Sequence, residues 1–147
     1  RDMASAFQRD PALLREAAAF MEQNPVVYLA TADGDSPRVR PVRYTFILDN
    51  KLVLATSAKK ELSQQIEKNP RVEVSVTAAD ASAFLRYKGR AVLSKDAQIR
   101  ERFLTAYPKF KTMYGDDLIL YLVEPEKVGI FPMRGGTPKT KDFGTLQ

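Results

Sequence analysis

The sequence contains neither cysteine nor histidine. The lack of cysteine excludes disulfides, thiolate catalysis and cysteine-ligated zinc or iron–sulfur clusters. The lack of histidine excludes a Ser-His-Asp triad, a histidine-ligated haem and any histidine metal site. We therefore expect no metal site in this chain.

Long apolar runs are also missing. No run approaches the roughly 18–20 residues that a membrane-spanning helix needs. The first ten residues, RDMASAFQRD, contain no apolar stretch of the kind found in a signal peptide. These absences predict a cytoplasmic protein with no membrane partner.

The residues that are present suffice for one folded domain. The chain has 147 residues, of which 44% are apolar, so residues 1–147 are expected to form a single domain with a core. The 23 basic and 18 acidic residues give a net charge of +5. This charge favours an anionic partner, either a nucleic acid or a phosphorylated small molecule.

Residue patterns predict three helices and seven strands. Asp10 and Pro11 suit the start of a helix over residues 10–24, because they are favoured at the N-cap and at the first helical position. Apolar residues at helical spacing predict two further helices, over residues 60–68 and 96–107. Alternating or continuous apolar runs predict strands over residues 26–31, 38–48, 52–56, 71–77, 84–93, 118–123 and 127–131. Residues 132–147, rich in glycine, proline and lysine, are expected to form an extended tail.

The connections between these strands predict the fold class. Short turns such as Asp33-Gly34-Asp35 imply antiparallel pairing. Strands and helices do not alternate regularly, so a doubly wound parallel sheet is not expected. Gly89, inside a predicted strand, indicates the bulge or bend that a barrel needs at its corners. The sequence therefore predicts a mainly β fold, an antiparallel barrel with helices at its joints.

Three arginines lie within the predicted strand 38–48. Arg38 and Arg40 point to one face, because strand side chains repeat every two residues, and Arg43 points to the other. Pro41 cannot donate to a strand ladder and so marks an edge-like position. The pattern fits a solvated basic face. It equally fits an anion site, because paired guanidinium groups suit a phosphate.

A second basic segment leaves a strand and opens a helix; it contains Thr56, Ser57, Lys59 and Lys60. A helix N-terminus is already positive, so lysines there are easier to understand if an anion binds at that end. The simpler interpretation is a capped helix with exposed lysines. A hairpin over residues 38–56 is expected to bring both basic segments onto neighbouring strands, which favours the anion site. The chain has no glycine-rich phosphate loop, so side chains and a helix end would have to hold a phosphate.

The order of these segments resembles the pyridoxamine 5′-phosphate oxidase-related family of FMN-binding split barrels. The resemblance covers residues 25 to 131. It rests on three stretches, VVYLATADGDSPRVRPVRY (26–44), KLVLATSAKKELSQQIEKNPRVEV (51–74) and FLRYKGRAVL (84–93). It implies a split β-barrel that binds flavin mononucleotide (FMN) at a homodimer interface, with a deazaflavin as the alternative cofactor.

The resemblance also implies roles for particular residues. Pro41 and Val42 would lie with Arg40 along the flavin and its ribityl chain. Thr56 and Ser57 would line the isoalloxazine ring. The phosphate would be met by Lys59 and Lys60, with Arg38 as a neighbouring candidate. Arg86 and Tyr87 would come near the flavin from one chain or the other.

The function that the resemblance implies is FMN-dependent oxidoreduction of a small molecule. Pyridoxamine 5′-phosphate oxidase itself carries an Arg-x-His element near its C-terminus, whereas this chain has no histidine and ends in FPMRGGTPKTKDFGTLQ. We therefore expect a different, unidentified substrate. Two alternatives stay open. One is a flavin-binding electron carrier or sensor without its own substrate, and the other is a nucleic-acid-binding barrel whose basic strand follows a phosphate backbone.

Residues 118–123, LILYLV, are apolar on both faces of their predicted strand. A strand buried on both sides needs a helix or a second subunit over its outer face. The N-terminal helix could supply that cover, and so could the partner in a homodimer. We expect the homodimer, with residues 131–143 as a candidate segment to reach across and close the partner's site.

Overall fold

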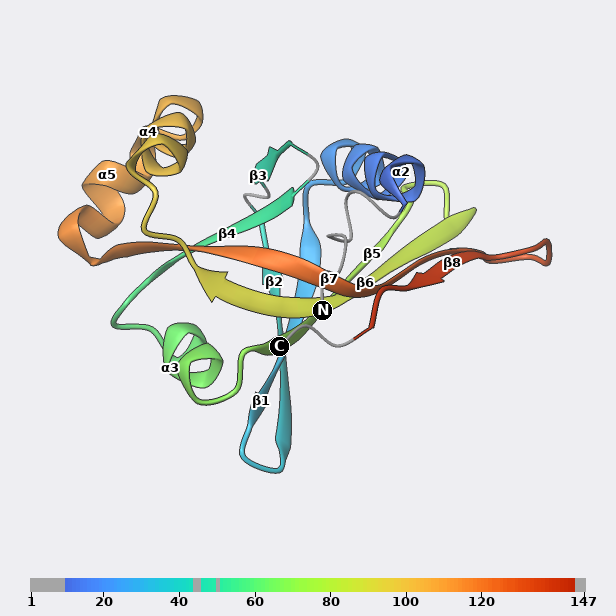
Figure 1. Cartoon of the computed structure of the whole chain (residues 1–147), viewed down its shortest axis with the longest axis horizontal. Coiled ribbons are helices and arrows are strands. Elements are labelled where there is room, and N and C mark those ends of the chain that lie inside the picture. Colours follow the sequence, from blue (N-terminus) through green and yellow to red (C-terminus); the bar gives the residue numbers. More distant parts are fainter. Residues whose placement is uncertain (1–9, 44–45, 50, 145–147) are drawn as a thin grey trace, which may run out of the picture.

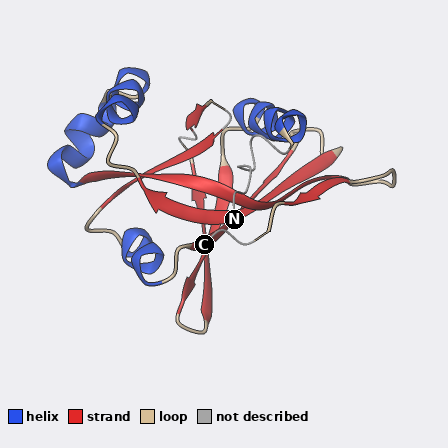
Figure 2. Cartoon of the chain, in the orientation of Figure 1, coloured by secondary structure: helices blue, strands red, loops and turns tan. Residues whose placement is uncertain are grey.

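The computed structural model of this chain describes residues 10–43, 46–49 and 51–144 (Figure 1). These residues form an eight-stranded antiparallel sheet with helices around it (Figure 2), so the prediction of a mainly β, antiparallel fold is confirmed. The strands are β1 (Val27–Asp33), β2 (Ser36–Val42), β3 (Phe46–Leu48), β4 (Lys51–Ser57), β5 (Arg71–Thr77), β6 (Ala83–Leu93), β7 (Leu118–Pro132) and β8 (Lys139–Asp142). The helices are α2 (Pro11–Gln23), α3 (Glu61–Lys68), α4 (Ala97–Ala106) and α5 (Lys109–Tyr114), followed by a short 3-10 helix, η1 (Gly115–Asp117). None of the described helices is both long enough and apolar enough to cross a membrane.

The sheet has the strand order β2-β1-β5-β6-β7-β4-β3, and β8 pairs with β7. Strands β2 and β3 follow each other in the chain but lie at opposite ends of this order. Within the described ranges no ladder joins β2 to β4. The barrel is therefore open along one side, between β2 at one end of the order and the β4–β3 pair at the other.

The barrel interior contains the apolar side chains that strand alternation predicts. Val72, Val74 and Val76 of β5 are buried, as are Leu85 and Tyr87 of β6. The β6–β7 register shifts between Lys88 and Gly89, which confirms the predicted bulge. Glycine is required at this position, because a Cβ on Gly89 would lie 2.3 Å from the carbonyl oxygen of Glu124.

Helix α2 packs on this interior. It begins after Asp10, whose carboxylate accepts a hydrogen bond from the Leu13 amide at 3.1 Å, and it ends at Gln23, two residues before Pro25. Its buried face, which includes Leu14 and Met21, joins the same core cluster as the barrel strands. The helix expected over residues 10–24 is thus present and amphipathic.

Helices α4 and α5 cover the outer face of β4 and β7. Leu118 and Leu120 of β7 pack there with Phe103 and Phe110 of the two helices, in a second core cluster. Tyr121, of the opposite parity, faces the barrel interior instead. The strand that is apolar on both faces is therefore covered by helices of its own chain, and it gives no argument for a second subunit.

Three predicted strands were wrong in their extent. The predicted strand 38–48 is two strands, β2 and β3, which pair with different partners; Tyr44, between them, lies outside the described residues, as does Asn50 in the next predicted turn. The predicted strands 118–123 and 127–131 form one long strand, β7, which continues through Pro125. The bulge opposite Gly89 accommodates the extra residue, Glu126, so the ladder is not broken.

The predicted extended tail was also wrong within the described residues. After Pro132 the chain turns back, and β8 pairs with β7 as a hairpin, with Lys127 opposite Asp142 and Ile130 opposite Lys139. Phe143 then enters the core with only 1% of its surface exposed. The hairpin therefore packs on its own subunit.

Candidate functional site

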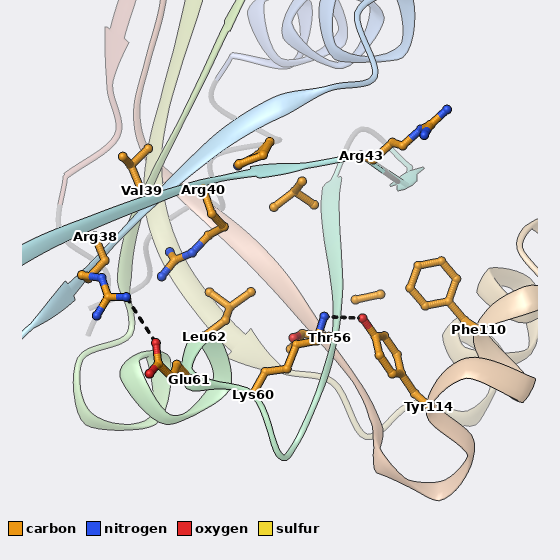
Figure 3. Close-up of a pocket in the computed structure, with 13 residues that line it drawn as sticks. Arg38, Val39, Arg40, Arg43, Thr56, Lys60, Glu61, Leu62, Phe110 and Tyr114 are labelled. Carbon is orange, nitrogen blue, oxygen red and sulfur yellow. Dashed lines mark hydrogen bonds and ion pairs between the residues drawn. The ribbon is translucent and has the colours of Figure 1, made fainter.

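A cleft of about 500 Å³ lies at the open side of the barrel (Figure 3). One wall is β2, from Arg38 to Val42, together with Arg43, which follows the strand. The opposite wall is the end of β4, with Ala55 and Thr56, and it continues into the first residues of α3. Helix α5 supplies the aromatic rings of Phe110 and Tyr114 at one end. Three segments far apart in the sequence therefore enclose one space.

Arg40 is half-buried in the β2 wall and is held by neutral oxygens. Its Nη1 donates to Thr31 Oγ1 at 2.8 Å and to the Leu29 carbonyl at 3.3 Å, and its Nη2 donates to Gln65 Oε1 at 2.7 Å. In the described part of the chain no ion pair joins Arg40 to a carboxylate. Burial lowers the pKa of Arg40, the charge of Arg38 lowers it further, and Glu61 acts in the opposite sense. The cleft wall therefore carries a partly desolvated positive charge.

Arg38, two residues along the same strand, is neutralised by its neighbours. Its guanidinium is 3.3 Å from the Asp33 carboxylate and 3.2 Å from the Glu61 carboxylate, the second of which is drawn in Figure 3. Both pairs are solvent-exposed and contribute little to stability. They nevertheless reduce the charge that Arg38 presents to the cleft.

Lys60 lies at the N-terminus of α3, and its side chain extends toward α5. Its Nζ donates to the Tyr114 hydroxyl at 2.7 Å and lies 5.0 Å from the centre of the same ring (Figure 3). Lys60 is also the N-cap of α3, and its side chain makes no capping bond. The first amides of α3 therefore receive no side-chain acceptor from Lys60, and they and the ammonium group add positive charge to this end of the cleft, beside the carboxylate of Glu61.

Six of the eight predicted ligands line the cleft, namely Arg38, Arg40, Pro41, Val42, Thr56 and Lys60. The other two do not. Ser57 is buried, and its Oγ accepts the Lys59 amide at 3.2 Å. The Lys59 ammonium group instead pairs with Asp117 at 3.2 Å. The two lysines that the sequence treats alike thus have different partners.

The expectation that β2 and β4 pair as a hairpin was wrong. Strand β2 pairs with β1, and β4 pairs with β3 and β7. The two basic segments meet because they face each other across the open side of the barrel. Arg43 has the predicted opposite parity, and Figure 3 shows its side chain pointing away from Arg38 and Arg40.

The remaining candidates lie elsewhere. Tyr87 is fully buried in the barrel, and its hydroxyl donates to the Val123 carbonyl at 2.9 Å. Arg86 pairs with Glu73 at 3.1 Å. Over the described residues no group of three or more acidic side chains is arranged to hold a metal ion.

Sequence reasoning missed the aromatic end of the cleft and the side chains behind Arg40. The spacing of Phe110 and Tyr114, four apart, is the signal that could have identified α5 and one aromatic face. Thr31 and Gln65 gave no comparable signal, because a single polar residue in a strand or an amphipathic helix is usually a surface residue.

The sequence matches one known family over most of its length. Residues 13–129 match the family described as pyridoxamine 5′-phosphate oxidase. No curated protein matches the chain.

Solved structures share the fold. A NimC/NimA family protein from Clostridium acetobutylicum is 30% identical, with a TM-score of 0.75, over 87% of this chain and 90% of that one. A haem-binding protein from Mycobacterium smegmatis is 20% identical, with a TM-score of 0.74, over 90% of this chain and 59% of that one. An FAD-binding protein from Mesorhizobium loti is 18% identical, with a TM-score of 0.66, over 80% of this chain and 93% of that one. The last two likenesses show the fold alone, and because their ligands differ, the fold does not determine the ligand.

Proposed function

This chain belongs to the pyridoxamine 5′-phosphate oxidase family of split β-barrels, and we propose that it is an FMN-dependent oxidoreductase with its cofactor in the cleft between β2 and β4. The state of Arg40 carries the proposal. Its guanidinium is half-buried and close to a second arginine, and among the described residues it hydrogen-bonds only to neutral oxygens, so the nearby Glu61 offsets its charge without pairing with it. An anionic group in the cleft would supply the missing counter-charge to Arg40.

The cleft also fits FMN in size and in the chemistry of its lining. Its volume of about 500 Å³ falls within the range of small-molecule sites, roughly 300–1,000 Å³. In this proposal Arg40 and Lys60 hold the anionic part of the cofactor, with Arg38 beside them. Pro41 and Val42 offer apolar contact, and Thr56 offers a hydroxyl.

When bound, FMN would supply the hydride or electron transfer. The residues of the chain itself would bind, orient and polarise the cofactor. Cationic side chains in a half-buried cleft favour negative charge on a bound ring, and the rings of Phe110 and Tyr114 offer that ring an aromatic surface. The absence of histidine excludes the Arg-x-His element of pyridoxamine 5′-phosphate oxidase, so we propose another, unidentified small molecule as the substrate, with the cytoplasm as the location.

We also propose that the protein is a homodimer with the cofactor at the seam. Val39 and Tyr28, on the outer face of β2 and β1, are 70% and 53% exposed, and Val26 beside them is 45% exposed. Val39 and Pro41 of this apolar surface also line the cleft. A second copy that covered these residues would therefore also close the cleft.

FMN binding can be tested with two lysine variants. We expect the wild-type protein to bind FMN at least about tenfold more tightly than riboflavin, because riboflavin lacks the phosphate. Lys60→Met should weaken FMN binding by about tenfold or more, and Lys59→Met, which removes an equal charge outside the cleft, should change it by less than about twofold. Titrations followed by flavin fluorescence measure all four affinities.

Two outcomes would count against the proposal. A protein that binds no FMN would refute it, and equal losses in the two lysine variants would show that the phosphate does not lie at Lys60. Turnover with a nicotinamide donor and nitroaromatic or quinone acceptors then separates an oxidoreductase from a carrier or sensor. A deazaflavin in the same titration tests the alternative cofactor.

A further inference from the structure

We infer that Gln65 is a positioning residue that holds Arg40 through a neutral acceptor and thereby leaves the guanidinium without a carboxylate partner and available to an anionic ligand. The inference rests on the proposed function, because it concerns the cleft in which FMN is proposed to bind. It concerns how the cleft prefers a phosphorylated cofactor over a neutral one.

Gln65 and Thr31 form a buried polar pair behind Arg40. Each is only 5% exposed. The Thr31 hydroxyl donates to Gln65 Oε1 at 2.6 Å, and the same oxygen accepts Arg40 Nη2 at 2.7 Å. Arg40 Nη1 donates to Thr31 Oγ1 at 2.8 Å. Helix α3, strand β1 and strand β2 thus meet at one three-membered network that fixes the orientation of the guanidinium.

Burial of an amide and a hydroxyl is costly unless they are hydrogen-bonded. An apolar residue at position 65 would pack on the core like its neighbour Ile66, without that cost. Among the described residues, Arg40 is the only charged side chain that hydrogen-bonds to this polar pair, and the position of the pair behind the cleft wall explains its presence better than packing does.

The choice of a neutral acceptor is the informative feature. Arg38 on the same strand is paired with two carboxylates, Asp33 and Glu61. Arg40 instead donates hydrogen bonds of similar geometry to an amide, a hydroxyl and a carbonyl, which orient it without cancelling its charge. A glutamate at position 65 would make the same bonds and would neutralise the guanidinium. Of these two arginines in the same wall, Arg38 is neutralised and Arg40 is available.

The test compares two isosteric changes on one helix, Gln65→Glu and Gln64→Glu. Gln64 is exposed, so its variant adds the same charge to α3 away from the cleft. We expect Gln65→Glu to weaken FMN binding at least about tenfold and riboflavin binding by less than about twofold, because only FMN carries the phosphate. Gln64→Glu should change neither by more than about twofold. Equal losses for both flavins in Gln65→Glu would mean that Gln65 only shapes the cleft, and would overturn the inference.

A second measurement needs no flavin and so separates this inference from the proposed function. If Arg40 is uncompensated, it lowers the pKa of a carboxyl introduced at position 65 below the usual value of about 4.3. The stability contributed by that carboxylate is present above this pH and lost below it. The Tm of Gln65→Glu relative to wild type should therefore rise between about pH 3.5 and pH 7. A relative Tm that falls or stays flat over this range would overturn the inference even if FMN binds, and a rise would uphold it even if FMN does not.

Discussion

Tyr87 is the largest side chain that the described part of the barrel buries completely. Its ring fills the interior at β6, and its hydroxyl is satisfied by the Val123 carbonyl. Burial raises the pKa of the phenol, and the nearby charge of Glu124 raises it further. The folded protein therefore keeps this proton at a pH where an unfolded chain has already lost it.

This shift predicts a loss of stability in alkali. The unfolded tyrosine ionises near pH 10, whereas folded Tyr87 stays protonated, so its contribution is present below about pH 10 and declines above it by about 1.4 kcal/mol per pH unit. Tyr87→Phe should remove this part of the pH dependence, while Tyr28→Phe, at an exposed ring, should leave it unchanged. Urea unfolding at about pH 8 and about pH 11 measures the difference. An equal decline in the free energy of unfolding between these two pH values in wild type and Tyr87→Phe would contradict the assignment.

Strand alternation alone is enough to predict the burial of Tyr87 and of its neighbours on β6. The bend at Gly89 is likewise predictable, because few positions in a strand require the absence of a side chain. The role of Gln65 is not, because it depends on Thr31 and Arg40, which are distant in the sequence. Residues that act in pairs across the fold give no local signal.

The hairpin of β7 and β8 shows how an element can form without a sequence pattern of its own. All four residues of β8, Lys139 to Asp142, are exposed, so no apolar alternation marks the strand. What fixes it is the ladder to β7 and the aromatic residue that follows, Phe143, whose amide donates to the Glu126 carbonyl at 2.7 Å. Helices α2, α3 and α4, by contrast, have the apolar spacing or cap residues that predicted them.

Phe143 should therefore be important for stability despite its place near the end of the chain. We expect Phe143→Ala to lower the free energy of unfolding by about 3–5 kcal/mol, the usual cost of removing a buried phenyl ring. Met133 lies in the turn of the same hairpin and is 47% exposed. Met133→Ala should therefore change the free energy of unfolding by less than about 0.5 kcal/mol. Urea denaturation measures both. A small effect of Phe143→Ala would mean that the hairpin is not anchored in the core.

At the scale of the whole molecule, the sheet order was the part that could not be predicted. Local turns identify β1–β2 and β5–β6 as antiparallel pairs, but nothing in residues 38–48 shows that the chain leaves one end of the sheet and joins the other. The prediction of an anion site on Arg40 and Lys60 named residues that do share a cleft, though through a different geometry. Basic residue spacing identified the walls, and the open side of the barrel brings them together.

The exposed apolar surface on β1 and β2 predicts the oligomeric state. We expect light scattering at micromolar concentration to give twice the 16.5 kDa of the chain. Val39→Glu should shift the mass toward the monomer and weaken FMN binding together, because a buried, unpaired charge opposes association. Met133→Glu, at the turn of the β7–β8 hairpin, is the matched control and should remain dimeric. A wild-type monomer with full flavin occupancy would refute the shared site.

The pairing of β4 with β7 has a consequence for how the protein folds. Leu52 lies opposite Val123, so this ladder joins segments that are far apart along the chain, whereas the β5–β6 hairpin needs only a short loop. Loop-closure entropy makes the distant pairing slow and late. During synthesis, β2 and the start of α3 leave the ribosome long before the rings of α5 and the residues of β7. We expect a nascent chain to contain a local β-hairpin but no cleft. A cofactor would therefore bind to the folded barrel and not to the nascent chain.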